Sequence, residues 1–404
     1  MASTDVSGPP VDRTSSLINN PRFRGLFYQV ALILVVGWIG YDIYSNALDN
    51  LRRLNLVPGD GFLDRTAGFG IIQSLIDYSE ASSYRRALFV GLINTLLVAV
   101  LGIVFATLLG FLIGIARLSR NWLIAKIAAA YVEIFRNTPL LLQIFFWYFA
   151  VLRSVPDMRS KWSLFGIAHL NIGGVYLPRP VFGPDAGLIG IALLGGVAVS
   201  IIVSSWAASR REELGRPPRV WPVHLALIVG LPVLVFFLVG RPISFSMPVF
   251  NETGPLLRRG FERGSGLVVI PELVGLLLAL TIYTAAYIAE IVRAGIRAVS
   301  HGQTEAASSL GLRPGQTLRL VVVPQAMRVI IPPLTNQFLN LTKNSSLAVA
   351  IAYPDLVSVG GTVLNQTGRA VEIVGVWMAV YLGLSVLTSI IMNAFNRRVA
   401  LVER

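Results

Sequence analysis

Long apolar stretches dominate this chain and restrict it to a narrow set of folds. A helix needs about 20 apolar residues to cross the hydrocarbon core of a bilayer, and most of these stretches reach that length. Inside hydrocarbon, only helices and closed barrels satisfy their own backbone groups. We therefore expect an all-α integral membrane protein with about eight transmembrane helices, near residues 26–45, 88–115, 123–152, 186–208, 221–240, 268–293, 321–342 and 373–395.

The seventh of these stretches is less regular than the others. Pro324, Pro332 and Pro333 interrupt its apolar pattern, and polar residues follow it. Proline removes a backbone donor and clashes with the preceding helical turn. We therefore expect the prolines to break this span.

The composition indicates a membrane environment. Hydrophobic residues make up 54% of the chain and charged residues only 14%, far from an average soluble domain. The net charge of +13 would suit nucleic acid, but the basic residues are scattered and flank apolar segments. That placement is typical of interface and loop charges, so we expect membrane lipid and no nucleic acid as a partner. The absence of cysteine excludes disulfides, zinc-thiolate sites and a thiol nucleophile.

The ends of the chain suggest an orientation. Residues 1–25 are polar and expected to be flexible, ahead of an N-terminal transmembrane anchor at 26–45 that is too long for a signal-peptide core. Basic residues of short loops, such as Arg117 and Arg397, fall on one side of an eight-span topology. Because such residues favour the cytoplasm, both termini are placed there.

The segment 300–324 has the features of a short capped helix. Ser300 and Gln303 form an S-x-x-Q capping box that would start the helix. Gly311 lies where a left-handed C-cap is needed, and Pro314 cannot continue the helix. One face carries small or apolar side chains, namely Ala306, Ala307 and Leu310. Such a face suits the groove of another protein, and the alternative is an amphipathic helix packed on its own chain.

The same segment resembles the cytoplasmic signature of ABC importer permeases, which reads E-A-A, three residues, a glycine, and a spacer ending in apolar-x-apolar-proline. The matching residues are Glu305, Ala306, Ala307, Gly311, Val321, Val323 and Pro324. In that family this helix docks on the ATPase subunit and passes its motion to the membrane helices. The resemblance implies an ATPase-coupling role for Glu305, Ala306, Ala307, Leu310, Gly311 and Pro324.

Three further motifs resemble those of the polar amino-acid uptake branch of these permeases. They read YVEIFRNTPLLLQ at 131–143, AAYIAEIVRAG at 285–295 and LTKNSSLA at 341–348. Asn137 replaces the usual glycine of the first motif, and Asn344 replaces the usual acid of the third. As a whole, the chain is most similar to a subunit of a general L-amino-acid ABC importer.

That branch usually has five spans, which divides this chain into a core and an addition. The type-1 permease domain would cover 88–395, with a core of 88–152 and 268–395. The insert at 153–267 carries two extra spans, expected to pack outside the core. It also contains VYLPRPVF at 175–182, which we interpret as a small hairpin or an extended arm.

Polar residues after the seventh span are the candidate substrate pathway: Lys343, Asn344, Ser345 and Ser346. Polar backbone at membrane depth is tolerated mainly where it lines a cavity or a protein interface, and a buried lysine needs a partner. The alternative is a lysine whose ammonium group snorkels to the far interface.

Charged residues near the span ends are interpreted as structural. Glu133 and Arg136 lie three residues apart and are positioned for a local ion pair, next to a kink expected at Pro139. Glu290 and Arg293 end the sixth span and are expected to orient the coupling helix.

A glycine pair and three histidines are the other notable patterns in the sequence. Gly110 and Gly114 form a G-x-x-x-G motif that favours helix packing. His169, His224 and His301 are too scattered for a metal cluster, and we expect them to be solvated.

The chain has no G-x-x-x-x-G-K-[ST] loop and no arrangement that suggests catalysis. We expect a transporter subunit and not an enzyme, with no cofactor or metal bound by this chain; ATP and Mg would be used by a partner. The resemblance implies an ABC ATPase subunit dimer, a sister permease subunit in a heterodimer, and a periplasmic amino-acid-binding protein, at the bacterial cell inner membrane. One alternative is a permease of the same branch for another solute, such as an opine. Another is an ion-coupled secondary carrier, which would need inverted repeats and buried acids.

Overall fold

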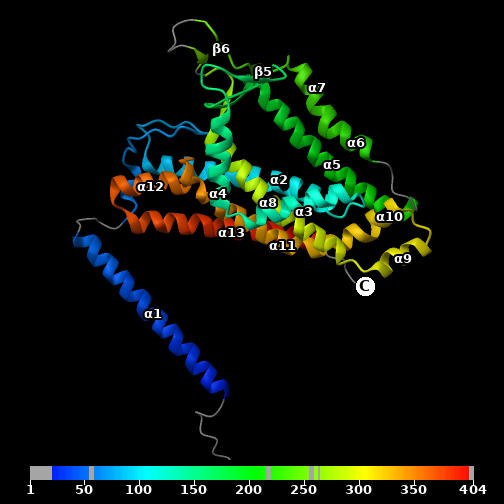
Figure 1. Ribbon diagram of the computed structural model, residues 1–404, viewed down its shortest axis with the longest axis horizontal. Coiled ribbons are helices and arrows are strands. Elements are labelled where there is room, and N and C mark those ends of the chain that lie inside the picture. Colours follow the sequence, from blue (N-terminus) through cyan, green and yellow to red (C-terminus); the bar gives the residue numbers. More distant parts are fainter. Residues whose placement is uncertain (1–20, 54–58, 215–219, 254–258, 263, 400–404) are drawn as a thin grey trace, which may run out of the picture.

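The computed structural model describes residues 21–53, 59–214, 220–253, 259–262 and 264–399, which fold mainly into helices (Figure 1). In the described chain, seven helical segments are long and apolar enough to cross a membrane. A bent pair, Trp122–Asn137 and Leu140–Ser154, makes an eighth when it is counted as one span. The expected helical membrane protein with about eight spans is confirmed.

The spans are built by α1 (Pro21–Arg53), α2 (Tyr84–Ala116), α3 (Trp122–Asn137) with α4 (Leu140–Phe145), α5 (Gly187–Leu214), α6 (Trp221–Leu225) with α7 (Leu231–Leu238), α8 (Pro271–Arg297), α10 (Pro314–Thr317) with α11 (Val323–Asn344), and α13 (Ala370–Val399). Two shorter helices, α9 (His301–Ser309) and α12 (Leu356–Thr367), lie between spans. In Figure 1, α2, α3, α8, α11 and α13 form the central bundle, with α12 at one end and α9 at the other.

Helices α2 and α8 have the most extensive contact in the bundle. A Cβ on Gly110 of α2 would lie 2.6 Å from the Cβ of Ile288 on α8, and one on Gly114 would lie 2.8 Å from the Cβ of Val292. Because glycine lacks this atom, the two backbones approach closely at both positions. The packing role expected for the G-x-x-x-G motif is confirmed.

The third span is sharply bent at Pro139. Helices α3 and α4 meet at an angle of 107°, so the expected kink is present and is strong enough to turn the chain. Proline leaves carbonyl groups of the preceding turn without donors. The Gln143 side chain supplies the missing donors, because its Nε2 donates to the carbonyls of Phe135 at 2.9 Å and Thr138 at 3.0 Å.

The seventh span is not broken by its prolines, and that expectation is wrong. The chain is helical from Pro314 to Ile351, and Pro332 and Pro333 lie inside α11. Pro324 occupies the first turn of α11, where no intrahelical donor is required, and a π-helical segment (Leu318–Val322) leads into it. Inside a membrane bundle, neighbouring helices and local adjustments let a helix continue through proline.

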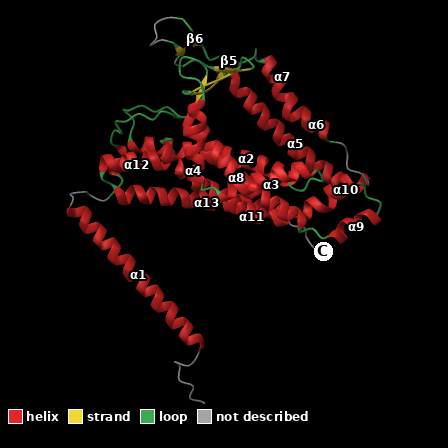
Figure 2. Ribbon diagram, viewed as in Figure 1, coloured by secondary structure: helices red, strands yellow, loops and turns green. Residues whose placement is uncertain are grey.

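The insert adds short strands that the all-helical expectation does not include, seen at the far end of α4 in Figure 2. They are β1 (Trp162–Leu164), β2 (Ala168–Asn171), β3 (Gly174–Leu177), β4 (Arg179–Phe182), β5 (Ile243–Ser246), β6 (Phe250–Asn251), β7 (Gly260–Phe261) and β8 (Leu267–Val269). A four-stranded sheet has the order β1-β2-β3-β8, and two further pairs are β4-β5 and β6-β7.

Of the two forms expected for 175–182, the hairpin is not formed and the extended form is present. Strand β3 pairs with β2 and β8, whereas β4 pairs with β5. Only Pro178 separates β3 from β4, and one residue is too short to reverse the chain. The segment is therefore extended and divided between two sheets.

Helices α5 to α7 form an antiparallel hairpin whose base is closed by β4 and β5 (Figure 1). Its two arms are joined by a hydrogen bond between Ser200 Oγ and His224 Nδ1, 2.6 Å apart. His224 is thus not solvated as expected. His169 also departs from that expectation, because its ring lies 5.6 Å from that of Phe261.

Helix α1 stands apart from the bundle in Figure 1. None of its most apolar window is buried within this chain. It begins at Pro21, so the end of the N-terminal segment expected to be flexible is helical, and residues 1–20 lie outside the described chain.

Candidate functional site

Helix α9 carries most of the expected coupling residues, and its start differs from the sequence prediction. Ser300 is the N-cap residue, but its side chain makes no capping hydrogen bond. The partner expected in the capping box, Gln303, instead accepts a hydrogen bond at Oε1 from Nε2 of Gln325 at 3.0 Å. The capping box is therefore wrong, and the same side chain links α9 to the first turn of α11.

The end of α9 has the expected left-handed glycine. Gly311 has a φ of +73°. Its N–H donates to the carbonyl of Ser308 at 2.9 Å, and the N–H of Leu312 donates to the carbonyl of Ala307 at 3.1 Å. This pair of bonds defines a Schellman motif, which fixes where the helix stops.

The face predicted for Ala306, Ala307 and Leu310 is divided between two environments. Ala307 is buried against its own chain, whereas Ala306 is exposed. Leu310 is 81% exposed, and the Glu305 side chain is 76% exposed, 3.7 Å from His301. An apolar and an acidic side chain therefore project from α9 at one end of the bundle (Figure 1).

A polar pocket of about 300 Å³ lies between the end of α2, α3 and α8. Its lining residues are Arg117, Ala129, Val132, Glu133, Arg136, Asn137, Tyr287 and Glu290. Charged side chains from three helices therefore converge on one cavity at the end of α2.

The charges of this pocket are not paired as the sequence suggested. In the described chain, no ion pair joins Glu133 to Arg136. The Arg136 guanidinium lies 5.1 Å from the centre of the Tyr287 ring, and the Tyr287 hydroxyl donates to the Arg136 carbonyl at 3.3 Å. Glu133 and Arg136 thus line the pocket without neutralising one another.

Glu290 connects two helices and does more than pair locally. It forms ion pairs with Arg293 on its own helix and with Arg117 at the end of α2. The pairing with Arg117 joins residues 173 positions apart, so local spacing did not reveal it. Glu290 also lines the pocket, which the interpretation as a purely orienting residue missed.

The four residues of the predicted pathway lie at the end of α11 and the start of the 3-10 segment Ser345–Ile351. Lys343 is exposed, and Ser345 is fully buried. The Ser345 hydroxyl donates to the Thr342 carbonyl at 2.7 Å, and Ser346 donates to the Lys343 carbonyl at 2.7 Å. None of the four lines the pocket between α2, α3 and α8.

A buried polar cluster that the sequence did not reveal lies beside α12. Asp355 caps this helix by accepting from the N–H of Ser358 at 2.8 Å, and burial raises the pKa of Asp355 to about 7. Asn94 of α2 donates through Nδ2 to the carbonyl of Pro354 at 2.9 Å. The Thr95 hydroxyl accepts from the N–H of Leu356 at 3.1 Å. These bonds fasten the start of α12 to α2.

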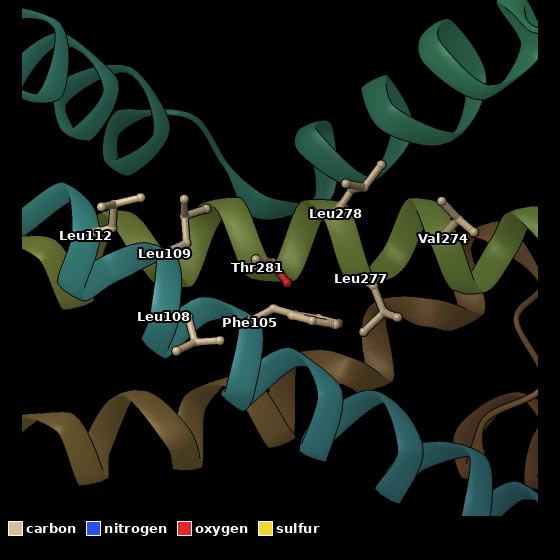
Figure 3. Close-up of a pocket in the computed structure, with 8 residues that line it drawn as sticks. All are labelled: Phe105, Leu108, Leu109, Leu112, Val274, Leu277, Leu278 and Thr281. Atoms are coloured by element: carbon tan, nitrogen blue, oxygen red, sulfur yellow. The ribbon is translucent and has the colours of Figure 1, made fainter. Parts of the chain in front are cut away.

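An apolar groove of about 530 Å³ lies between α2 and α8 (Figure 3). Its lining is Phe105, Leu108, Leu109, Leu112, Val274, Leu277, Leu278 and Thr281. Figure 3 shows Phe105 and Leu277 reaching into the space between the two helices. With Thr281 as its single polar lining residue, this groove suits hydrocarbon and excludes a charged solute.

The chain is similar to known proteins over most of its length. Residues 102–401 match the family model described as the binding-protein-dependent transport system inner membrane component. A general L-amino acid transport system permease protein of Rhizobium johnstonii is 53% identical over 393 residues, covering 96% of this chain and 95% of the relative. A glutamate/glutamine/aspartate/asparagine transport system permease protein of Rhodobacter capsulatus is 41% identical over 435 residues, covering 99% of each.

Among solved structures, an amino acid ABC transporter crystallised with histidines has 23% identity and a TM-score of 0.47, covering 78% of this chain and 95% of that chain. The family match spans most of the chain, and the relatives are matched over nearly their whole length. The chain therefore belongs to the family of inner-membrane components of binding-protein-dependent transport systems.

Proposed function

We propose that this chain is the permease subunit through which an ABC importer passes L-amino acids across the bacterial inner membrane. The relatives named for general L-amino acids and for glutamate, glutamine, aspartate and asparagine support this substrate class. The observation that carries the proposal is the polar pocket between α2, α3 and α8.

The pocket has the chemistry that a zwitterion requires. An amino acid carries a carboxylate and an ammonium group close together, and both lose water when they enter a membrane protein. The Arg136 guanidinium offers donors to the carboxylate, and Glu133 offers an acceptor to the ammonium group. The two side chains lie one helical turn apart on α3, a spacing that fits the two backbone groups of the solute.

Of the predicted pathway residues, Lys343, Asn344 and Ser346 have exposed surface and fit a second contact along the same route, whereas Ser345 is buried. Lys343 to Ser346 lie toward the α12 end of α11, away from α9. A cationic amino acid needs acidic side chains along its route to replace the water around its charge. Lys343 and Asn344 supply no carboxylate, so this stretch favours neutral and acidic amino acids over lysine or arginine. Uptake competition in vesicles checks this preference, and strict selectivity for arginine and lysine would exclude it.

In this proposal, α9 is the helix on which the ATPase docks and through which ATP hydrolysis drives transport. Glu305 and Leu310 are exposed, and α9 is joined to α11 through Gln303 and Gln325. Docking of an ATPase dimer on α9 would thereby move α11 and the bundle. ATP and Mg are bound by that dimer and not by this chain.

The proposal also includes the orientation of the permease and its partners. Both termini are cytoplasmic, a sister permease without the insert completes a heterodimer, and a periplasmic binding protein delivers the amino acid. The core spans 88–152 and 268–395, and the insert 153–267 lies outside it. Helices α5 to α7 pack chiefly on one another, which suits this division.

The test is uptake by vesicles that contain the assembled importer, ATP inside and loaded binding protein outside. Arg136→Gln and Glu133→Gln should each lower the rate of amino-acid uptake at least about tenfold, because each leaves one charged group of the solute unpaired. Arg297→Gln, an exposed arginine on α8 outside the pocket, is the matched control and should transport normally. Normal uptake by Arg136→Gln would remove the main support for the proposal.

A further inference from the structure

The hairpin between β1 and β2 has a turn that its sequence disfavours. The N–H of Ile167 donates to the carbonyl of Leu164 at 3.2 Å, which closes the turn. The two residues between them, Phe165 and Gly166, have φ values of +53° and +69°. Turns with two positive φ values prefer asparagine followed by glycine, because a side chain such as phenylalanine is strained there.

Within the described residues, little of the strained Phe165 side chain is covered by its own chain. Phe165 is 89% exposed, and the side chains around it are also exposed: Trp162 at 58%, Leu164 at 62% and Ile167 at 53%. Three large apolar side chains, those of Leu164, Phe165 and Ile167, therefore surround the turn, and Trp162 lies at the opposite end of β1. Exposed apolar clusters of this kind mark interaction sites.

The register of the sheet points this tip away from the helical bundle. Val269 of β8 is followed after one residue by α8, and it pairs with Val175. Val175 in turn pairs with Leu170 of β2, and Leu170 pairs with Trp162 of β1. These residues mark the end of the sheet that is nearest to α8. The turn at Phe165 lies beyond the opposite end of β1 and β2. The tip therefore projects from the side of the sheet farthest from the start of α8.

The excess of basic residues around the hairpin favours a partner with an acidic surface. Between residues 153 and 183, the chain carries four basic residues, Arg153, Arg159, Lys161 and Arg179, and one acidic residue, Asp157. Lys161 forms an ion pair with Glu252 at 3.7 Å, so the three arginines supply the remaining positive charge. An apolar tip on a basic base fits a protein surface with an apolar hollow surrounded by carboxylates.

We propose that the β1–β2 hairpin, residues 162–170, is a docking element for the extracytoplasmic solute-binding protein, with Phe165 as its central anchor. This inference rests on the proposed function, since it presumes an importer supplied by such a protein. The sheet gives the contact a mechanical route, because β8 runs into α8, the helix that carries Tyr287 and Glu290 of the polar pocket. Binding of the loaded protein at the hairpin would thus be transmitted through the sheet to α8 and the helical bundle.

The decisive variant is Phe165→Asn, because asparagine suits the turn and keeps the hairpin folded while it removes the aromatic ring. Phe182→Ala is the matched control, an exposed phenylalanine on β4 in another sheet. The assembled importer is placed in lipid nanodiscs, and loaded binding protein is titrated in. We expect Phe165→Asn to raise the Kd for the binding protein about tenfold or more and to lower stimulated ATP hydrolysis, with basal hydrolysis unchanged. Phe182→Ala should match the wild type.

Each outcome decides one question. Wild-type importer that shows no stimulation by any binding protein would refute the proposed function. Stimulation of the wild type together with unchanged affinity in Phe165→Asn would refute the docking inference alone.

A label at the tip separates a protein partner from lipid. The natural chain has no cysteine, so Phe165→Cys carries a fluorophore at a single place in this subunit. A change of emission on addition of binding protein supports docking. Quenching by spin-labelled lipid that binding protein does not alter would show that the tip enters the membrane, which overturns the inference.

Discussion

Gly110 of α2 and Ile288 of α8 leave no space for a methyl group between their helices. Overpacking a close contact costs about 1–3 kcal/mol, so Gly110→Ala should lower the thermal stability of the purified permease and its yield. Gly383→Ala on α13 is the matched control, because no atom lies within 4 Å of a Cβ there. That control should be neutral or slightly stabilising. Equal unfolding temperatures for the two variants would contradict the close packing of α2 on α8.

Gly311 tests the coupling role of α9. Its positive φ makes Gly311→Val strained by about 1 kcal/mol or more, which should fray the end of α9 without affecting the spans. We expect normal membrane insertion, weaker co-purification of the ATPase subunit and loss of stimulated ATP hydrolysis. Glu305→Ala should weaken ATPase binding less. Glu305 lies inside α9, so this substitution removes one side chain and leaves the end of the helix intact.

Gly315→Val is the matched control for Gly311→Val. Gly315 lies four residues later, has no positive φ and has no atom within 4 Å of a Cβ. It should retain the ATPase subunit and transport. Wild-type transport by Gly311→Val would show that α9 is not the coupling element.

Asp355 should make the stability of the permease depend on pH. Its pKa is raised from 3.8 to about 7 by burial, so the folded protein keeps a proton that the unfolded chain releases. The stabilisation is fully present below about pH 4 and is lost as the pH rises through 7.

Asp355→Asn removes that dependence, because its amide oxygen is still able to accept from Ser358 and carries no charge. The variant should be more stable than the wild type at pH 8 by roughly 2–4 kcal/mol, with a smaller difference at pH 5. Thermal unfolding at pH 5 to 8 measures the difference. A gap that narrows as the pH rises would contradict a buried, protonated carboxyl group.

The helical hairpin of the insert should be removable. Phe182 and Ile243 are register partners at the end of the β4–β5 pair. Replacing residues 183–242 by Asn-Gly would close these strands with a two-residue turn. We expect the shortened permease to insert, bind the ATPase and transport, because α5 to α7 pack chiefly on one another. Loss of ATPase binding would show that the hairpin supports the core.

Local chemistry made part of the structure predictable. Gly311 is followed by Pro314 and preceded by helix-forming residues, so its left-handed conformation could be anticipated from neighbours alone. The spacing of Gly110 and Gly114 indicated close packing for the same reason, although it did not name α8 as the partner. The kink at Pro139 followed from the missing N–H.

Contacts between distant residues were not predictable in this way. The pairing of Arg117 with Glu290 depends on the packing of α2 against α8, and the link from Gln303 to Gln325 replaced a local capping box. Continuation of α11 through Pro332 and Pro333 depends on the bundle around it and not on helix propensity. The polar pocket escaped notice because three separate helices supply its lining.

The nested pairing of β3 with β8 and of β4 with β5 also preserves the sidedness of the permease. Two spans between paired strands form an even number of crossings, so the chain returns to the side from which it left. Everything after Leu267 keeps the same orientation with or without them, including α9. Insertion or removal of this hairpin would therefore leave α9 on the same side of the membrane.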